Sequence, residues 1–367
     1  MDKRSFFQII RPYFTVFDAP LALIVFLILS LGMVAVYSAG YDFPGRIEDH
    51  MRNILISFIV MWIAAIIPPQ TLMRFAVPLY AVGVSLLIAV AVFGLIKKGA
   101  RRWLDVGIVI QPSEILKIAV PLMLAWYFQK REGAKRWQDF AIAAVLLLVP
   151  VGLIMRQPDL GTSLLVMAAG FYVIFLAGLS WKVLTGLAVA VAASLPVAWS
   201  MLHGYQRNRV MTLIDPSSDP LGKGFHIIQS TIAIGSGGMT GKGWLNGTQS
   251  HLEFIPERTT DFIFAVFSEE FGLMGNCILL VLYLLLIGRG LIIAANAPTL
   301  FSRLLAGALT LMFFTYAFVN MGMVSGILPV VGVPLPFMSY GGTAFVTLGL
   351  GIGILMSIQR HRKLVQT

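Results

Sequence analysis

Apolar runs of membrane-spanning length recur along almost the whole chain. A helix needs about 20 largely apolar residues to cross the hydrocarbon core of a bilayer, and ten runs approach that length. Only 12% of the residues are charged, about half the share found in soluble proteins, which excludes a soluble enzyme. We predict an all-α integral membrane protein in which residues 1–367 form a single membrane domain. The ten predicted transmembrane helices are about 20–39, 53–68, 74–95, 113–128, 138–155, 160–178, 182–202, 262–288, 301–328 and 339–358.

The longest polar connection, 203–262, joins the seventh and eighth predicted spans, and a loop of this length in a compact protein is usually functional. An even number of spans places both termini on one side of the membrane. Fourteen of the 27 Lys and Arg residues lie at the termini or in connections on that side. Of the other thirteen, five lie in the long loop, which the positive-inside rule discounts, so the comparison is fourteen against eight. The charges favour cytoplasmic termini and an extracytoplasmic long loop.

Basic residues on the outward side need an explanation of their own. Arg101 and Arg102 precede Trp103, and Arg207 lies in the long loop. The positive-inside rule disfavours cations on this side, so their presence indicates an anionic ligand. Contact with anionic lipid head groups is the alternative. Trp103 is typical of the aromatic belt at the membrane interface, which is the default interpretation, and its indole face beside two guanidinium groups makes contact with a sugar phosphate the second one. We expect no nucleic acid partner, because the basic residues are dispersed.

Three ionisable residues lie at or just inside the ends of predicted spans. Glu114 and Lys117 are three residues apart, so they share one helix face and can neutralise each other. This structural pairing ranks slightly ahead of a direct ligand role. Asp159 falls near a helix N-terminus, where the helix dipole stabilises a carboxylate. It either caps that helix or positions Lys117 or a ligand, and the sequence leaves both roles open.

Asp261 is the last polar residue before the eighth predicted span. A helix that starts at Thr259 or Thr260 would place this acid in its first turn, where the dipole or Arg258 would stabilise it. The alternative role is that of a general base, which must reach a substrate hydroxyl. The residue chemistry alone does not decide between these roles.

Two further acids, Glu269 and Glu270, lie inside the same apolar run. In a continuous helix they would lie roughly 12 to 14 Å deeper than Asp261, at about 1.5 Å per residue. We therefore expect interior-facing structural or coupling groups, with basic partners on other helices.

The remaining polar patterns are weaker. His203, His226 and His251 are too scattered to predict a metal site. The stretch 326–342 contains three prolines, and irregular backbone at membrane depth is tolerated only where it is buried in protein or lines a cavity. We expect this stretch to form a re-entrant wall.

Taken together, five ordered motifs resemble those of the SEDS family, and within it the RodA branch. The resemblance covers essentially the whole chain. The motifs are RRWLDVG followed by QPSEILK, RQPDLGTSLL, GKGFHIIQSTIAIGSGGMTGKG, LEFIPERTTDFIFAVFSEEFG and PVVGVPLPFMSYGG.

The resemblance implies a ten-span peptidoglycan glycosyltransferase of the bacterial cytoplasmic (inner) membrane. Such an enzyme polymerises lipid II on the outer face and uses undecaprenyl-pyrophosphate-linked glycan as the donor. Asp261 matches the family's catalytic acid, and Trp103 matches a functionally important tryptophan. Arg101, Arg102, Lys117 and Arg207 are then expected to contact substrate, and Glu114, Asp159, Glu269 and Glu270 to position it. One departure is that Val109 and Ile110 stand where the family often has a basic residue before Gln111, so Arg101 or a neighbouring lysine would take that phosphate contact.

The resemblance also implies partners. We expect a class B penicillin-binding protein transpeptidase, other membrane proteins of the elongation complex, and no tightly bound cofactor, with a divalent cation, Mg²⁺ or Mn²⁺, left open. A lipid II flippase, a non-enzymatic scaffold and the division-specific FtsW-type polymerase are the alternatives.

Overall fold

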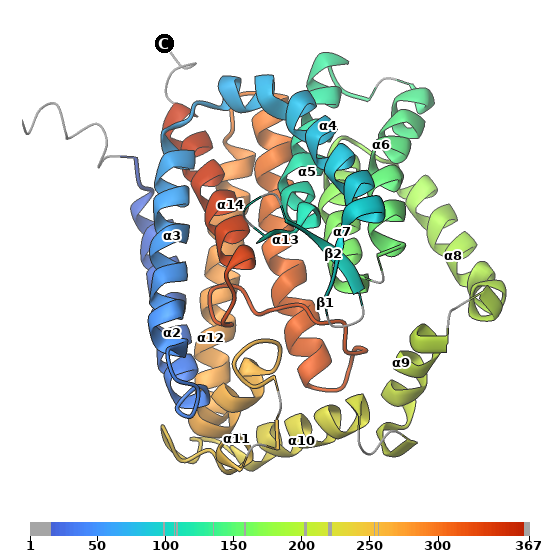
Figure 1. Cartoon of the computed structure of the whole chain (residues 1–367). Helices are drawn as coiled ribbons and strands as arrows, with labels where there is room; N and C mark the ends of the chain where they lie inside the picture. Colours follow the sequence, from blue (N-terminus) through green and yellow to red (C-terminus); the bar gives the residue numbers. More distant parts are fainter. Residues whose placement is uncertain are drawn as a thin grey trace, which may run out of the picture.

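The computed structural model is a helical bundle (Figure 1) and describes residues 16–97, 100–105, 107, 109–134, 136–157, 159–201, 204–218, 222–252, 254–255 and 257–362. Within these ranges, ten helices have 17 or more residues, and each coincides with one predicted span. The predicted transmembrane helices are therefore confirmed. They are α2 (Ala19–Ala39), α3 (Arg46–Ile66), α4 (Pro69–Phe93), α5 (Pro112–Lys130), α6 (Trp137–Met155), α7 (Leu160–Leu176), α8 (Trp181–Met201), α12 (Ile263–Ala295), α13 (Leu300–Val324) and α14 (Thr343–Arg360).

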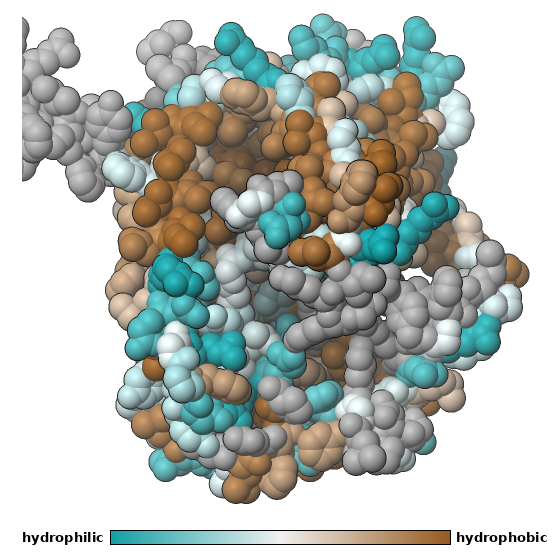
Figure 2. Space-filling view, in the orientation of Figure 1, coloured by the Kyte–Doolittle hydropathy of each residue, from teal (hydrophilic) through white to brown (hydrophobic). Residues whose placement is uncertain are grey.

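The lengths and composition of these helices fit a bilayer. Seven of them, among the described residues, are long and apolar enough to cross a membrane, and α7 and most of α8 are shorter apolar helices. On the face that Figure 2 shows, an apolar band covers the helices, with hydrophilic groups on both sides of it. The chain is thus a multi-pass membrane protein.

The ends of several helices differ from the prediction. Helix α4 begins at Pro69 rather than near residue 74, and α12 ends at Ala295 rather than near residue 288. Helix α3 begins at Arg46 rather than near residue 53, and Glu48 and Asp49 lie in its first turn, where the dipole favours acids. Helix α14 begins at Thr343 rather than near residue 339, because the proline-rich stretch before it stays non-helical.

A small antiparallel sheet between α4 and α5 was not predicted. Its strands are β1 (Leu95–Lys97), β2 (Ala100–Asp105) and β3 (Val109–Ile110), in the order β1-β2-β3. Leu95 is opposite Trp103, and Leu104 is opposite Ile110. The register shifts next to the first of these pairs, because Ile96 is opposite Arg101, so Arg102 is an extra residue in β2. Such a β-bulge changes the direction of a side chain.

The long loop is largely helical. It contains α9 (Gly204–Ile214), the 3-10 turn η1 (Pro216–Ser218), α10 (Lys223–Ser236) and α11 (Thr248–His251). Helices α10 and α11 cross one end of the bundle, and α2 begins and α14 ends at the opposite end (Figure 1). We call the end with α10 and α11 the loop end.

Helix α12 is two helices joined at Gly272. The backbone there has φ 64° and ψ −163°, which no helix interior adopts. The first part, 263–271, is a short helix, and the second part leaves the turn as a long membrane helix. Backbone hydrogen bonds from Leu273 N to Gly238 O (2.9 Å) and from Met274 N to Met239 O (3.0 Å) hold the turn against the long loop. The expectation of one continuous helix was wrong, because an apolar run carries no signal for a reversal at a single glycine.

We predict that Gly272→Ala lowers stability by about 1–3 kcal/mol, because an L-residue is strained at this positive φ. The added Cβ would also lie 2.9 Å from the Met239 carbonyl. Gly288→Ala, later in α12, is the matched control, because a Cβ there meets nothing within 4 Å. The unfolding temperature of the purified protein in detergent measures both, and equal temperatures for the two variants would contradict the strain at Gly272.

Candidate active site

A polar pocket of about 300 Å³ contains Asp261. Its walls come from β2, the start of α7, α10, the segment before α12 and the loop between α13 and α14. The polar lining residues are Arg102, Asp159, His226, Glu257 and Asp261, and the apolar ones are Leu160, Phe262, Val330, Val331 and Gly332. A second cavity, of about 340 Å³, lies between α2, α3 and α14, but Ser57 is its single polar lining side chain among the described residues. Only the first of these two cavities holds groups for acid–base chemistry.

The segment that carries Asp261 is fixed by a buried amide. Asn320 on α13 donates through Nδ2 to the backbone oxygens of Asp261 (2.8 Å) and Val333 (2.7 Å). Asp261 precedes α12, which begins at Ile263, so the predicted helix start at residue 259 or 260 was wrong. A Cβ at Gly332 would lie 3.3 Å from Asp261 Oδ2, so this carboxylate lies directly against a glycine backbone with φ 78°. The carboxylate is thus placed before any substrate arrives.

Arg258 anchors the same segment to α2. Its guanidinium is 3% exposed, forms an ion pair with Asp42 and donates from Nε to the Ala39 backbone oxygen at 2.8 Å. Tyr340 N donates to Thr259 O at 2.7 Å, which adds a second anchor from the loop before α14. The backbone on the N-terminal side of Asp261 is therefore held from two directions.

Arg102 and Asp159 form another part of the pocket lining. Arg102 Nη1 lies 3.7 Å from Asp159 Oδ2, and Arg102 Nε donates to the Gln157 backbone oxygen at 3.3 Å. Asp159 also accepts from Gln111 Nε2 and from Thr162 N, both at 3.1 Å, so it caps α7. Asp159 thus caps a helix, which is one of its two predicted roles, and the cation that it contacts is Arg102 rather than the predicted Lys117.

Glu114 and Lys117 form a buried pair that is separate from the pocket lining. The Lys117 Nζ to Glu114 Oε1 distance is 2.6 Å on α5, and Thr347 Oγ1 of α14 donates to Glu114 Oε2 at 3.0 Å. Lys117 Nζ lies 5.3 Å from the centroid of the Tyr316 ring on α13. The pair links three helices, which is the structural pairing ranked first from the sequence.

Three other predicted contacts also lie outside the pocket lining. Arg101 is exposed and donates from Nη1 to the Ala91 backbone oxygen at 3.1 Å. Arg102 is the extra residue of a β-bulge between Arg101 and Trp103, and of these three residues only Arg102 lines the pocket. Arg207 donates to the backbone oxygens of Trp199 (3.0 Å) and Ser200 (2.6 Å) near the end of α8.

The comparisons with known proteins identify the family. The model of the FtsW, RodA and SpoVE family, described as cell cycle protein, matches residues 18–364. The chain belongs to the FtsW/RodA/SpoVE family. It is 54% identical over 350 residues to the peptidoglycan glycosyltransferase MrdB of Escherichia coli (strain K12), covering 95% of each chain.

Two solved structures share the fold of this family member. One is a chain from a study of the structural coordination of polymerization and crosslinking by a peptidoglycan synthase complex. It has a TM-score of 0.82 and 36% identity, with coverage of 95% of this chain and 98% of that chain. The other is the crystal structure of the rod shape determining protein RodA of Thermus thermophilus. It has a TM-score of 0.72 and 29% identity, with the same coverage.

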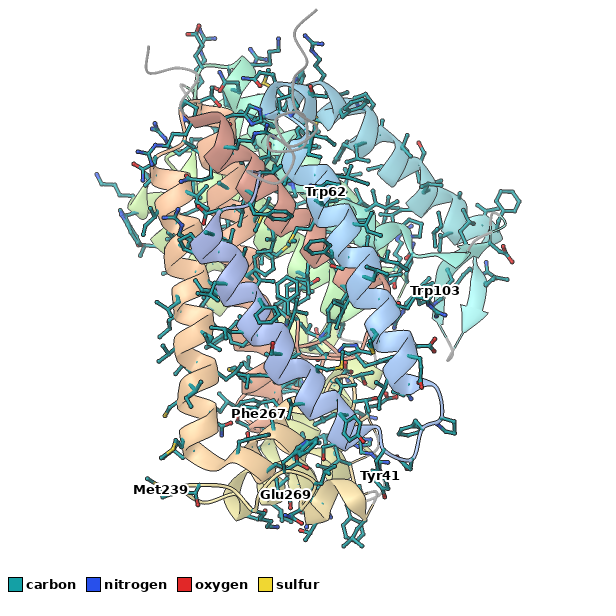
Figure 3. The ribbon with its side chains drawn as sticks, turned by 90° about the vertical axis from the view of Figure 1, so that its left-hand side faces the viewer. Tyr41, Trp62, Trp103, Met239, Phe267 and Glu269 are labelled. Carbon is teal, nitrogen blue, oxygen red and sulfur yellow. The ribbon has the colours of Figure 1, made fainter. Side chains whose placement is uncertain are left out.

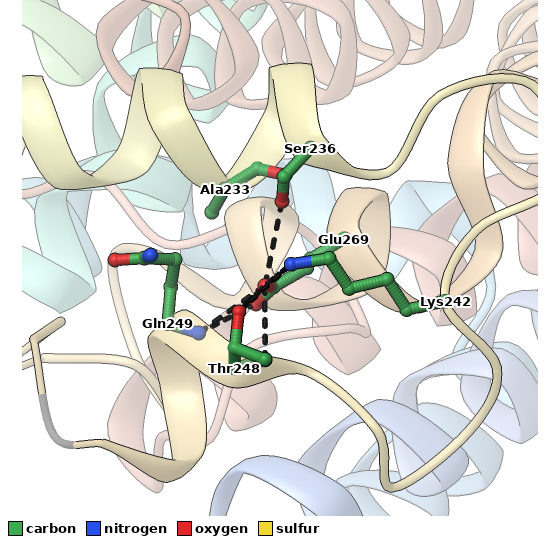
Figure 4. A network of polar contacts seen from close by, with 6 residues as sticks. All are labelled: Ala233, Ser236, Lys242, Thr248, Gln249 and Glu269. Atoms are coloured by element: carbon green, nitrogen blue, oxygen red, sulfur yellow. Dashed lines mark hydrogen bonds and ion pairs between the residues drawn. The ribbon is translucent and has the colours of Figure 1, made fainter.

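In this member of the FtsW/RodA/SpoVE family, Glu269 fastens the short helix 263–271 to the long loop (Figure 4). The carboxylate is fully buried and accepts from Lys242 Nζ (2.7 Å), from the Thr248 backbone and hydroxyl (both 2.9 Å) and from Gln249 N (3.1 Å). Lys242 N donates to the Glu269 backbone oxygen at 3.0 Å. We call Glu269, Lys242, Thr248 and Gln249 the loop clasp.

The depth expected for Glu269 and Glu270 was wrong. Figure 3 places Glu269 at the loop end of the molecule, beside Met239 and level with Tyr41, which follows α2. Glu270 is 1% exposed and accepts a hydrogen bond from Ser38 near the end of α2. Both acids lie near the loop because helix 263–271 runs toward that end before the chain reverses at Gly272.

Two pocket residues were missed from the sequence. His226 was considered only as a metal ligand, and its distance from Asp261 in the sequence gave no sign that α10 brings it to the same pocket. Glu257 lies in the same polar stretch as Asp261 and accepts from Thr260 Oγ1 at 3.0 Å. Its position four residues before Asp261 was a usable signal.

We predict that Glu269→Gln weakens the loop clasp and lowers stability by about 1–3 kcal/mol, because buried donors lose a charged acceptor. Lys242→Met should have a smaller effect of the same sign, because the backbone donors of Thr248 and Gln249 remain. Lys182→Met, exposed at the start of α8, is the control. Limited proteolysis of the long loop and the unfolding temperature measure the effect, and a loop as resistant in Glu269→Gln as in the control would exclude the clasp.

Proposed function

We propose that the chain is a peptidoglycan glycosyltransferase that polymerises lipid II into glycan strands during cell elongation. The observation that carries this proposal is that the carboxylate of Asp261 and the guanidinium of Arg102 line the same preformed pocket. The chain's 54% identity to an enzyme named for the same activity supports it. Glycosyl transfer between two lipid-linked sugars needs both a base and cationic donors near the membrane surface, and this pocket supplies both.

We assign these two groups roles in the following reaction. The 4-hydroxyl of the N-acetylglucosamine of an incoming lipid II attacks the anomeric carbon of the growing chain, and Asp261 takes the hydroxyl proton. A new glycosidic bond forms as the bond from the anomeric carbon to the pyrophosphate oxygen breaks. Undecaprenyl pyrophosphate leaves with that electron pair, and the configuration inverts from α to β. Because Asn320 holds the backbone of Asp261 and Gly332 lies against its carboxylate, the base needs little reorganisation.

Arg102 is assigned to the pyrophosphate. A guanidinium donates bidentate hydrogen bonds to phosphate oxygens and offsets the charge that grows on the leaving group. Its contacts with Asp159 and Gln157 restrict its orientation before substrate binds. Asp159 is therefore a positioning residue, and we assign the same class of role to Glu114 with Lys117 and to Glu269 with Glu270.

The orientation of the reaction follows from charge and lipid chemistry. With the termini in the cytoplasm, the loop end and the pocket face outward. The isoprenoid tails of both substrates stay in the bilayer while their sugars reach water at the pocket.

We infer that a class B penicillin-binding protein transpeptidase acts beside this chain and crosslinks the strands it makes. A similar chain, at TM-score 0.82, comes from a study of coordinated polymerization and crosslinking in a synthase complex, which supports this assignment. Other elongation-complex membrane proteins belong to the same proposal.

We propose that a divalent cation is held jointly by the protein and the substrate. Among the residues that the structure describes, no group of three or more His, Cys, Asp or Glu side chains is arranged to hold a metal ion. Mg²⁺ is commonly bound by one or two carboxylates together with substrate phosphates. Glu257 and Asp261 are the pocket carboxylates outside the Arg102 pair that could take such an ion with a pyrophosphate.

We predict that removal of divalent cations with EDTA lowers the polymerisation rate without lowering the unfolding temperature of the substrate-free protein. The reason is that the ion would bind only with the pyrophosphate. Restored activity on adding back Mg²⁺ or Mn²⁺ is the control. A fall in unfolding temperature on chelation would instead indicate a resident structural metal.

The decisive prediction concerns Asp261. Asp261→Asn should lower lipid II polymerisation by about 10²- to 10⁴-fold, the usual contribution of a general base. Asp215→Asn is the matched control, because Asp215 is an exposed acid in the same long loop. Gel analysis of glycan made from labelled lipid II by the purified protein with its transpeptidase partner measures the rate.

A flippase and a scaffold, unlike a polymerase, would make no glycan in that assay. A polymerisation rate of Asp261→Asn equal to that of the control would remove Asp261 as the base. A flippase would move lipid II across vesicles without making glycan, and a scaffold would do neither.

A further inference from the structure

His226 lines the Asp261 pocket, and the mechanism above gives this residue no role. It lies in the first turn of α10, far from the other pocket residues in sequence. Its ring stacks on that of Phe262, with centroids 5.7 Å apart and planes at 29°. Phe262 directly follows Asp261, so this stacking fixes the imidazole relative to the base.

The helix that carries His226 is itself anchored to the bundle. Ile227 is 4% exposed and Ser230 is fully buried. Ser230 Oγ donates to the Val324 backbone oxygen at 2.9 Å, at the end of α13. Helix α10 therefore presents His226 from a fixed position rather than from a mobile loop.

The charges of the pocket show what this position can do. Three carboxylates line it, those of Asp159, Glu257 and Asp261, and Arg102 is the one lining residue with a permanent positive charge among those described. The guanidinium is already engaged with Asp159 and Gln157. A pyrophosphate that enters this pocket needs further hydrogen-bond donors to offset its charge.

Imidazole can supply such a donor. Of the described lining residues, only Arg102 and His226 have side chains with N–H groups. The other lining side chains are carboxylates or apolar groups. A phosphate oxygen in the pocket that seeks a second side-chain N–H therefore finds it on His226.

We propose that His226 is a substrate-binding residue that donates a hydrogen bond to the pyrophosphate of the glycan donor, together with Arg102. This inference rests on the proposed glycosyltransferase function. The bond strengthens as negative charge grows on the departing pyrophosphate, so His226 assists departure of the leaving group as well as binding. Stacking on Phe262 orients the ring, and the N–H group carries the function.

Two substitutions separate the N–H group from the ring. His226→Phe keeps the stacking on Phe262 and removes the donor. His226→Gln keeps an N–H donor of similar reach and removes the aromatic ring. His361→Gln is the control, because His361 follows the last turn of α14 and its Nδ1 lies 2.8 Å from the Ser357 backbone oxygen.

The experiment measures initial rates of lipid II polymerisation at several lipid II concentrations. It uses the full-length chain with its transpeptidase partner and penicillin present, so that strands stay uncrosslinked. His226→Phe is expected to raise KM for lipid II and to lower kcat/KM by about tenfold to a hundredfold, the usual effect of losing a hydrogen bond to a charged group. His226→Gln is expected to stay within about threefold of wild type, because it restores a donor. Unfolding temperatures check that both variants are folded.

The opposite pattern would overturn the inference. Wild-type kcat/KM in His226→Phe with a loss in His226→Gln would mean that His226 acts only by stacking. Equal losses in both folded variants would also exclude the donor role. Failure of the proposed function looks different, because wild type and His361→Gln would then make no glycan at all.

Discussion

The buried amide of Asn320 joins the two irregular segments from which the pocket is built. One segment carries Asp261 and the other carries Val333, and the Asn320 Nδ2 group donates to the backbone oxygen of each. At membrane depth an unpaired backbone oxygen costs several kcal/mol, so such segments persist only where protein groups satisfy them. Tyr340 N also donates a hydrogen bond to Thr259 O, so the two irregular segments hold each other in place. The pocket between them leaves space for a substrate.

The short helix 263–271 runs from the pocket to the loop end, where the chain reverses at Gly272. There Glu269 accepts hydrogen bonds from Lys242, Thr248 and Gln249. The short helix that follows Asp261 is thus fixed at both ends, by Asn320 and by the loop clasp.

The sequence predicts the membrane helices well because their signal is local. Each span is an apolar run, and each of the ten appears as a helix. Asp261, Arg102 and Asp159 could be found in the same way, since polar groups at the ends of apolar runs are costly and stand out.

The remaining features depend on contacts between distant segments. The three-stranded sheet has a register shift at Arg102, and Arg102 rather than Arg101 lines the pocket. The depth of Glu269 depends on the φ of Gly272, which no composition reveals. His226 and Asp261 line one pocket because α10 packs on α12 and on the end of α13. Arg207 is different, because its partners Trp199 and Ser200 are only eight and seven residues away in the sequence.

The central claim is that the Asp261 pocket is where the sugars react. A cryo-EM structure of the catalytically impaired Asp261→Asn protein with bound lipid II tests it most directly. The account predicts pyrophosphate density beside Arg102 and an acceptor 4-hydroxyl about 3 Å from the side chain at position 261. Sugar and pyrophosphate density away from this pocket, for example at the apolar cavity between α2, α3 and α14, would contradict it.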